Sequence, residues 1–276
     1  MYVVFDIGGT KMRIAASHDG KKLVKEKVLS TPSKFKSAMD LIAENYKDIA
    51  GKERAKAFGG GIAGVFDKNK RKLLYSPNMP GWVGKPLKKR LEEISGTKVY
   101  LENDAAMAGL GEAIYGAGLG QNIIAYLTIG TGVGGVRIVD GKIDSKTFGF
   151  EPGHQVIDMD SSATGRFTDL EGLVSGAGIT RRFGTAPKNL KDEKIWEQIA
   201  RLLAYGVNNT VCYWSPNMVV LGGGLVNEEV ISIDKVKSYL KMIMQNFPGI
   251  PEVKKSKLGD QAGLIGSLIY LDSVNS

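Results

Sequence analysis

The sequence predicts an α/β fold built from two similar domains. Two segments resemble each other, residues 3–15 and 125–139, because each has a β-branched run, a turn of glycine and threonine, and a second short apolar run. Glycine supplies the positive φ that a tight turn needs, so each segment is typical of a β-hairpin. The hairpins lie about 120 residues apart with helical stretches between them. This spacing favours a domain repeat over a short-period solenoid.

Helices are expected where apolar residues recur at spacings of three and four. These stretches are residues 33–49, 104–115, 192–213 and 234–246, and a last helix begins near Asp260. Asn103 or Asp104 stands where a residue that caps the second helix is expected. No linker rich in Pro, Gly or Ser separates the two halves. We therefore expect the domains to pack closely around a cleft.

Composition excludes several classes of protein. A hydrophobic fraction of 43% is enough for a sizeable core. The single cysteine, Cys212, allows neither an intramolecular disulfide nor a cysteine cluster that binds zinc. There is no signal-peptide pattern and no apolar run of about 18 residues, so we expect a cytoplasmic protein with no membrane partner.

The basic charge needs a separate interpretation. Lys and Arg total 37 against 29 Asp and Glu, for a formal net charge of +8. The densest basic clusters, residues 68–72 and 85–90, have no interleaved aromatic residues that could stack on bases. A solvated surface is favoured over a polyanion site, and no nucleic-acid partner is expected.

Three glycine-rich turns have the residue types that bind phosphate. Glycine lets backbone N–H groups approach phosphate oxygens closely, and threonine adds hydroxyl donors. Lys11 offers a point charge to a terminal phosphate, and Asp6 could hold Mg²⁺ directly or through water. The candidate cofactor-binding residues are Asp6, Gly8, Gly9, Thr10, Lys11, Gly130, Thr131, Gly132, Gly222, Gly223 and Gly224.

Each turn by itself is more often only a tight turn. The first turn lacks the Walker A pattern, and a strand rather than a helix follows it, unlike the dinucleotide-binding fingerprint. Two such hairpins with a third glycine run downstream are, however, the pattern of actin-like ATPases.

With these motifs the chain resembles the ROK (repressor, open reading frame, kinase) sugar kinases over essentially its whole length. The matching motifs are DIGGTK at 6–11, SPNMPGW at 76–82, ENDA at 102–105, GE at 111–112, IGTGVGG at 129–135, EPGH at 151–154, LE at 170–171, GGG at 222–224 and GDQAGLIG at 259–266. The resemblance implies the actin-like ATPase (ribonuclease H-like) fold, with two lobes around a central cleft. The smaller lobe would hold residues 1–105 plus 261–276, and the larger lobe residues 106–260.

The resemblance also implies the chemistry, which is phosphorylation of a sugar hydroxyl by ATP and Mg²⁺. Asp104 corresponds to the family's general base, and Asn103 would bind a neighbouring sugar hydroxyl. A base near an alcohol makes sense because phosphoryl transfer needs the hydroxyl oriented in line and relieved of its proton. The alternative is that Asn103 and Asp104 simply cap a helix, and both roles can hold together.

The other sugar-binding residues that the resemblance implies are Gly64, Asn78, Glu151, His154 and Glu171. Carboxylates and an imidazole suit vicinal sugar hydroxyls because each engages defined donors and acceptors. Without the motif, a lone histidine would be interpreted as a structural residue. Trp82 is expected to pack in the core rather than to stack on the sugar.

The chain departs from the family where most members bind zinc, in the pattern C-x-C-G-x-x-G-C-x-E ahead of Glu171. Its three cysteine positions hold Ser162, Thr164 and Asp169. Two hydroxyls and a carboxylate cannot replace three thiolates, so no structural zinc is expected. Residues 155–170 must then be ordered by other packing or remain mobile until substrate arrives. His154 would also be free to titrate.

Phosphorylation of glucose to glucose 6-phosphate is the first choice of reaction. The alternatives are an N-acetylmannosamine or N-acetylglucosamine kinase and a fructokinase, and polyphosphate is an alternative donor. A DNA-binding regulator is disfavoured because no recognition helix fits ahead of Asp6. A non-catalytic protein of the same fold is disfavoured because Asp104 and both hairpins are present. Relatives are commonly homodimers or tetramers, and a homodimer is expected by resemblance.

Overall fold

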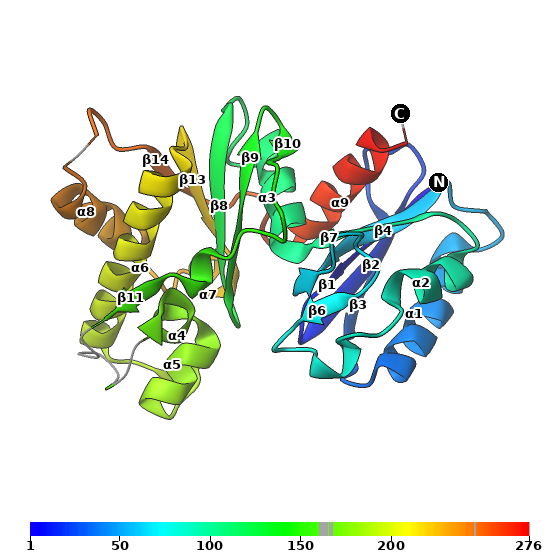
Figure 1. The fold of residues 1–276 in the computed structure, drawn as a ribbon, viewed down its shortest axis with the longest axis horizontal. Coiled ribbons are helices and arrows are strands. Elements are labelled where there is room, and N and C mark those ends of the chain that lie inside the picture. Colours follow the sequence, from blue (N-terminus) through cyan, green and yellow to red (C-terminus); the bar gives the residue numbers. More distant parts are fainter. Residues whose placement is uncertain (160–164, 166–167, 246, 276) are drawn as a thin grey trace. The chain divides into compact units, whose positions relative to one another are not determined.

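The computed structural model of the protein describes residues 1–159, 165, 168–245 and 247–275. The chain forms two compact units (Figure 1). Unit 1 consists of Met1–Gly111, Ser145–Gly149 and Gln261–Ser276, and unit 2 of Glu112–Asp144 and Phe150–Asp260. The sequence-based boundary lies after residue 105, whereas the compact units divide six residues later, inside a helix. The short segment Ser145–Gly149 returns to unit 1.

A five-stranded sheet forms the centre of unit 1, in the order β3-β2-β1-β4-β7. The first three strands are antiparallel neighbours, while β1, β4 and β7 run parallel. The elements are β1 (Tyr2–Ile7), β2 (Lys11–Ser17), β3 (Val24–Ser30), α1 (Phe35–Ala50), β4 (Ala57–Ile62), β5 (Val65–Phe66), β6 (Leu73–Tyr75), η1 (Pro80–Trp82), α2 (Leu87–Ser95), β7 (Val99–Asn103), the start of α3 (Asp104–Ile114), η4 (Gly259–Gln261, which begins in unit 2) and α9 (Ala262–Ser273).

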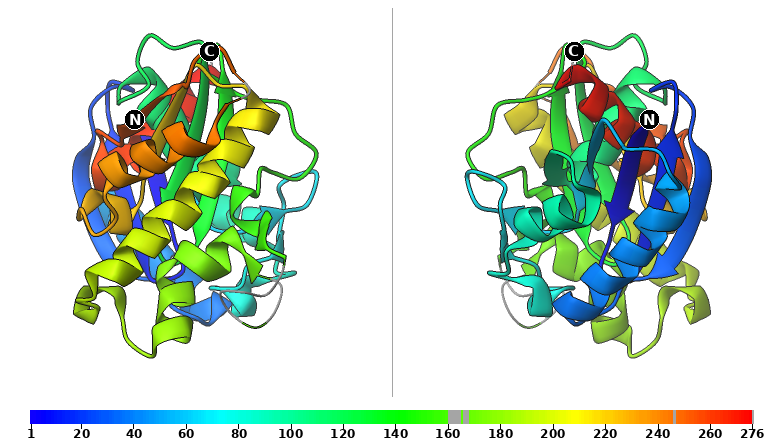
Figure 2. Two further views of the ribbon diagram at one scale, coloured as in Figure 1. Left: turned by 90° about the vertical axis from the view of Figure 1, so that its left-hand side faces the viewer. Right: turned by 90° about the vertical axis from the view of Figure 1, so that its right-hand side faces the viewer.

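Alternation along β1 explains why unit 1 has helices on both faces of its sheet. Val3, Phe5 and Ile7 pack with residues of α1 and α2 in one core cluster. Val4 faces the other way and packs against Leu264 and Leu268 of α9. Helix α1, the blue helix in Figure 2 (right), lies along its own face of the sheet.

Unit 2 repeats this design with a second five-stranded sheet, in the order β10-β9-β8-β13-β14. Its main core packs α4, α6 and α8 against the sheet, and α6 and α8 lie side by side (yellow and orange, Figure 2, left). The elements are the end of α3, β8 (Ile123–Ile129), β9 (Val133–Val139), β10 (Lys142–Ile143), η2 (Pro152–His154), β11 (Val156–Asp158), β12 (Thr168–Asp169), α4 (Leu170–Val174), α5 (Gly176–Phe183), η3 (Pro187–Asn189), α6 (Glu193–Trp214), β13 (Met218–Gly222), α7 (Gly224–Asn227), α8 (Ile233–Ile243) and β14 (Glu252–Lys255).

The structure confirms the predicted α/β class and the predicted repeat. Both predicted hairpins form, as the antiparallel pairs β1–β2 and β8–β9. In each unit the hairpin leads into a third antiparallel strand on one side and two parallel strands on the other. All five predicted helices are present with ends shifted by a few residues, as α1, α3, α6, α8 and α9. Each helix among the described residues is too short or too polar to be a candidate membrane span.

Candidate active site

Three parallel strands of unit 1 end at the same edge of its sheet. Ile7 of β1 pairs in register with Ile62 of β4, and Ile62 pairs with Asn103 of β7. The residues that follow these strands therefore gather at one edge, the usual place for ligand sites in sheets of this type. That edge carries the first glycine turn, Gly64 and the start of α3.

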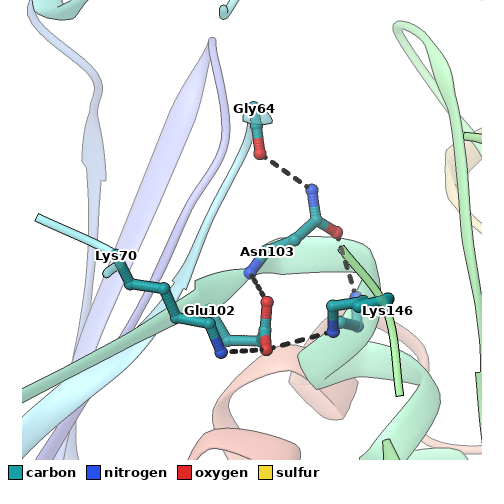
Figure 3. Close-up of polar contacts among 6 residues, drawn as sticks. Gly64, Lys70, Glu102, Asn103 and Lys146 are labelled. Carbon is teal, nitrogen blue, oxygen red and sulfur yellow. Dashed lines mark hydrogen bonds and ion pairs between the residues drawn. The ribbon is translucent and has the colours of Figure 1, made fainter. Parts of the chain in front are cut away.

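Asn103 fastens the junction between β7 and α3. Its side-chain oxygen accepts a hydrogen bond from Ala106 N at 3.1 Å, which is the N-cap interaction. Its side-chain nitrogen donates to Gly64 O at 3.2 Å (Figure 3). The helix cap expected for Asn103 or Asp104 is thus made by Asn103, whose amide orientation is fixed by two bonds.

Asp104 is the first residue of α3 and is half-buried. Burial raises the pKa of its carboxyl to about 6, although N–H groups of the backbone at Ala105 and Asp104 work in the opposite direction. The bond from Ala105 N to Asp104 Oδ1 is 2.9 Å long. A carboxylate with a pKa this close to neutrality can accept a proton and still be ionised at physiological pH.

Two glycines let the chain approach this junction. A Cβ on Gly61 would lie 2.7 Å from Asp104 Cα, so only glycine allows β4 to pass so close to the start of α3. Gly64 has φ +135° and its Cβ position lies 2.6 Å from Tyr75 O. Gly64 therefore has a structural requirement for glycine in addition to its predicted place beside the sugar.

Glu102, just before the Asn103–Asp104 pair, is a buried carboxylate that sequence reasoning missed. Its Oε2 accepts from Lys70 Nζ at 2.6 Å and from Lys146 Nζ at 3.1 Å, and its Oε1 accepts from Asn103 N at 2.9 Å (Figure 3). Burial opposes its charge, but Lys146 and Lys70 outweigh burial and lower the pKa of Glu102. The lysines are 32 and 44 residues away from Glu102 in sequence, so no local sequence pattern predicts that they pair with it.

The first glycine turn is closed by the bond from Gly8 N to Lys11 O, 2.9 Å long. Thr31 holds the turn from the side, donating from its hydroxyl to Gly8 O at 2.7 Å and from its N–H to Thr10 O at 3.0 Å. Gly9 lies directly against Asn78, and a Cβ on Gly9 would overlap the Asn78 side chain. The turn therefore contacts a predicted sugar-binding loop within unit 1.

Trp82 has the expected role in the core below that loop. It is fully buried, and its indole N–H donates to Pro32 O at 3.1 Å. Its ring packs edge-on against Phe35 of α1.

In unit 2, the second glycine turn lies against the start of α5. Gly176 N donates to Gly130 O at 2.8 Å, and Ala177 N donates to Thr131 O at 3.1 Å. Glu171 Oε2 accepts from Val133 N at 2.8 Å on the other side of the turn. Glu171, a predicted sugar ligand, is therefore in direct contact with a predicted phosphate turn.

His154 closes η2, the short helix that follows the exposed residue Glu151. His154 Nδ1 and Asp169 Oδ2 are 2.8 Å apart, and Asp169 Oδ1 accepts from Gly172 N at 2.8 Å as the N-cap of α4. Burial alone would lower the pKa of His154, but Asp169, Glu171 and Glu151 together raise it. Asp169 thus joins His154 to the helix that carries Glu171.

The zinc site that most family members carry would fall at His154 and the residues ahead of Glu171, where no structural zinc is expected in this chain. Asp169 already uses both oxygens on His154 and on Gly172. Ser162 and Thr164, at the other cysteine positions, lie outside the described residues. Over the described part of the chain, no group of three or more His, Cys, Asp or Glu residues could hold a metal ion. The absence of zinc stays a prediction.

A cavity of about 710 Å³ opens beside the second glycine turn. Three predicted residues line it, Gly130, Thr131 and Gly224. Gly132 instead contacts Glu171, Gly222 ends β13, and Gly223 precedes α7. The remaining lining residues, which sequence reasoning missed, are Gly176, Ala177, Thr180, Arg181, Pro187, Leu225 and Glu228.

The sequence is similar to known sugar kinases along nearly its whole length. The ROK family matches residues 2–273. A glucokinase of Thermotoga maritima is 30% identical, over 95% of this chain and 94% of the relative. An N-acetyl-D-glucosamine kinase of Vibrio atlanticus is 29% identical, over 97% of this chain and 98% of the relative.

Solved structures agree on the fold. A ROK family glucokinase from Streptomyces griseus, solved with glucose and AMPPNP, superposes with a TM-score of 0.81 at 24% identity. The alignment covers 97% of this chain and 98% of the other. The paired α/β units are those of the actin-like ATPase fold. The family match over nearly the full length, with this fold, shows that the chain belongs to the ROK family.

Proposed function

We propose that the chain is a sugar kinase that transfers the terminal phosphoryl group of ATP to a hexose hydroxyl, with Asp104 as the general base. The observation that carries the proposal is the Asp104 carboxylate at the start of α3, half-buried and with its pKa raised to about 6. It stands at the strand edge where such sheets bind ligands. A base of this strength accepts the hydroxyl proton as the oxygen–phosphorus bond forms.

In each unit, polar groups of the matching motifs are candidates for binding a sugar hydroxyl. In unit 1, Asn103 has one amide hydrogen beyond its bond to Gly64 O, and this hydrogen suits a sugar hydroxyl. Gly64 lies between β4 and β5, and Asn78 lies in the loop after β6, where it contacts Gly9. In unit 2, Glu151, His154 and Glu171 offer carboxylate and imidazole groups to further hydroxyls, and Asp169 fixes the imidazole.

The donor side is assigned to the glycine turns and the cavity of unit 2. The cavity is large enough for a nucleoside, and Thr131 offers a hydroxyl and a backbone N–H to phosphate. The AMPPNP in the Streptomyces griseus relative supports ATP as donor. The turn from Gly8 to Lys11 would contact phosphate in unit 1. Asp6 would hold Mg²⁺ through water, and that ion would neutralise phosphate charge.

Glucose with phosphorylation at the 6-hydroxyl is the first choice of acceptor, which the Thermotoga maritima relative supports. An N-acetylhexosamine is the second candidate, because the Vibrio atlanticus relative is about equally similar. Fructose is third. The groups that separate these sugars are a few atoms around the 2-position.

An ADP-release screen over about ten sugars tests the proposal, with ATP and polyphosphate as separate donors. Asp104→Asn should keep sugar binding by calorimetry and lose turnover by about 10²- to 10⁴-fold. Asp234→Asn, which changes an exposed carboxylate on α8, is the matched control and should keep turnover. Absence of sugar-dependent ADP release with every sugar, or full turnover in Asp104→Asn, would refute the proposal.

A further inference from the structure

Three segments of unit 1 meet at the carboxylate of Glu102, and a fourth, α9, lies against one of its two lysine partners. Its side chain is 5% exposed and lies at the end of β7. Lys70 comes from the β5–β6 loop, Lys146 from the segment Ser145–Gly149, and the Lys70 ammonium lies 5.8 Å from the centre of the Tyr270 ring on α9. The two lysines are 32 and 44 residues away from Glu102 in sequence.

The surroundings of the two lysines differ. Lys70 has φ +51°, and its N–H donates to Asp67 O at 2.8 Å in a tight turn. Asp67 Oδ1 accepts from Arg71 N and from Lys72 N, which closes that turn. The Lys146 side chain is only 12% exposed. Lys146 is thus largely buried, and Lys70, whose side chain is 35% exposed, stands in a hydrogen-bonded turn.

A buried cluster of charges is by itself weak evidence for added stability. A buried ion pair is often no more stabilising than an apolar cluster of the same volume, because desolvation offsets the attraction between charges. Here one carboxylate is buried against two ammonium groups. The arrangement does, however, set the direction of Glu102 Oε1, which accepts the N–H of Asn103. That bond is made to the backbone of Asn103, which binds the sugar in the proposed function and stands next to Asp104.

We propose that Glu102, oriented by Lys70 and Lys146, is a positioning residue that fixes Asn103 and Asp104 for proton transfer; this inference rests on the proposed function. Glu102 acts through the Asn103 N–H and does not touch the substrate. The position of Asn103 in turn affects the start of α3 and the chain at Gly64, because its side chain is hydrogen-bonded to Ala106 N and to Gly64 O.

The sharpest variant is Glu102→Gln. It keeps an oxygen that can accept the Asn103 N–H but removes the charge that orients the two lysines. Displacement of a catalytic group by about 1 Å costs on the order of 10²-fold in rate. We expect kcat to fall by about 10- to 100-fold, while the KM for ATP changes by less than about threefold, since the nucleotide cavity belongs to unit 2.

Lys146→Met is the second variant. It tests whether Glu102 and Lys146 act together on kcat. It removes one partner and leaves Glu102 paired with Lys70, so it remains informative if Glu102→Gln folds poorly. It should lower kcat by about threefold to tenfold. The double variant should then lose little more than Glu102→Gln alone, because the interaction has already been removed. Glu93→Gln, which removes an exposed partner of Arg90 on α2, is the control and should keep wild-type kcat.

The readouts separate positioning from folding. All kinetics are measured at a temperature where circular dichroism shows each variant fully folded, and hydrogen exchange of residues 99–108 reports order at the junction. Faster exchange there with reduced kcat supports the inference. Unchanged kcat in folded Glu102→Gln, or strictly additive losses in the double variant, overturns it. Failure of the wild-type protein to phosphorylate any sugar overturns the proposed function first, which distinguishes the two failures.

Discussion

Replacing Asp104 by Asn should make the folded protein more stable at pH 8 even though it removes turnover. The reason is the cost of keeping a buried carboxylate ionised. Burial raises the pKa of Asp104 from 3.8 to about 6 in the folded protein. Each pKa unit corresponds to about 1.36 kcal/mol, so ionised Asp104 destabilises the fold by roughly 3 kcal/mol.

The sign of this effect sets a pH window. Between about pH 4 and pH 6, folded Asp104 holds a proton that the unfolded chain has released, so wild-type stability falls as pH rises. Above about pH 6 the full cost is present. The amide introduced by Asp104→Asn cannot ionise and can still accept the bond from Ala105 N, so the variant escapes the cost. The gain should be near zero at about pH 4 and at most about 3 kcal/mol at about pH 8.

Urea unfolding followed by circular dichroism at pH 4.5 and pH 8 measures the difference directly. Asp234→Asn controls for loss of a carboxylate at the surface and should stay within about 0.5 kcal/mol of wild type at both pH values. The reasoning fails if Asp104→Asn is less stable than wild type at pH 8, or if its gain is the same at both pH values. Either result would mean that burial does not destabilise the Asp104 charge.

Three further predictions concern catalysis and the residues around His154. For the free enzyme, kcat/KM should fall about tenfold per pH unit below about pH 6, as Asp104 becomes protonated; a flat profile from pH 5 to 8 would contradict its role as base. Asp169→Asn should keep the N-cap of α4 but remove the charged partner of His154, so sugar binding measured by calorimetry should weaken about tenfold. Asp192→Asn makes the same change at the N-cap of α6 and should leave sugar binding unchanged. Metal analysis of purified protein should find no stoichiometric zinc, and one zinc per chain would overturn the interpretation of this region.

The predictable part of the fold came from local signals. Glycine and threonine turns between β-branched runs predicted both hairpins, and three-and-four spacing predicted the main helices. These patterns work because turns and amphipathic helices are set by nearby residues. Strand β4 shows the limit of such signals. Its AFGGGI sequence looks like a turn, but it is a fully buried strand because its glycines admit close neighbours such as Asp104.

In the candidate site, too, some residues could be found from the sequence and others only from the structure. Motifs located Asp104, Asn103, His154 and Glu171, and their roles in catalysis stay predictions that the experiments above test. The partners of these residues were invisible in the sequence. In the sequence, Asp169 is only the residue at a position where most family members have a zinc-binding cysteine. In the structure, its carboxylate contacts His154 and orients the imidazole.

By itself, then, the sequence determined the α/β class, the duplicated hairpins, the family and the acidic residue proposed as the base. Only the tertiary structure decided what surrounds that residue: the burial that raises the pKa of Asp104, and the carboxylate of Glu102 with lysines 32 and 44 residues away. The physical reason is that turns and helices depend on neighbours along the chain. Desolvation and charge pairing depend on neighbours in space, which only the folded chain brings together.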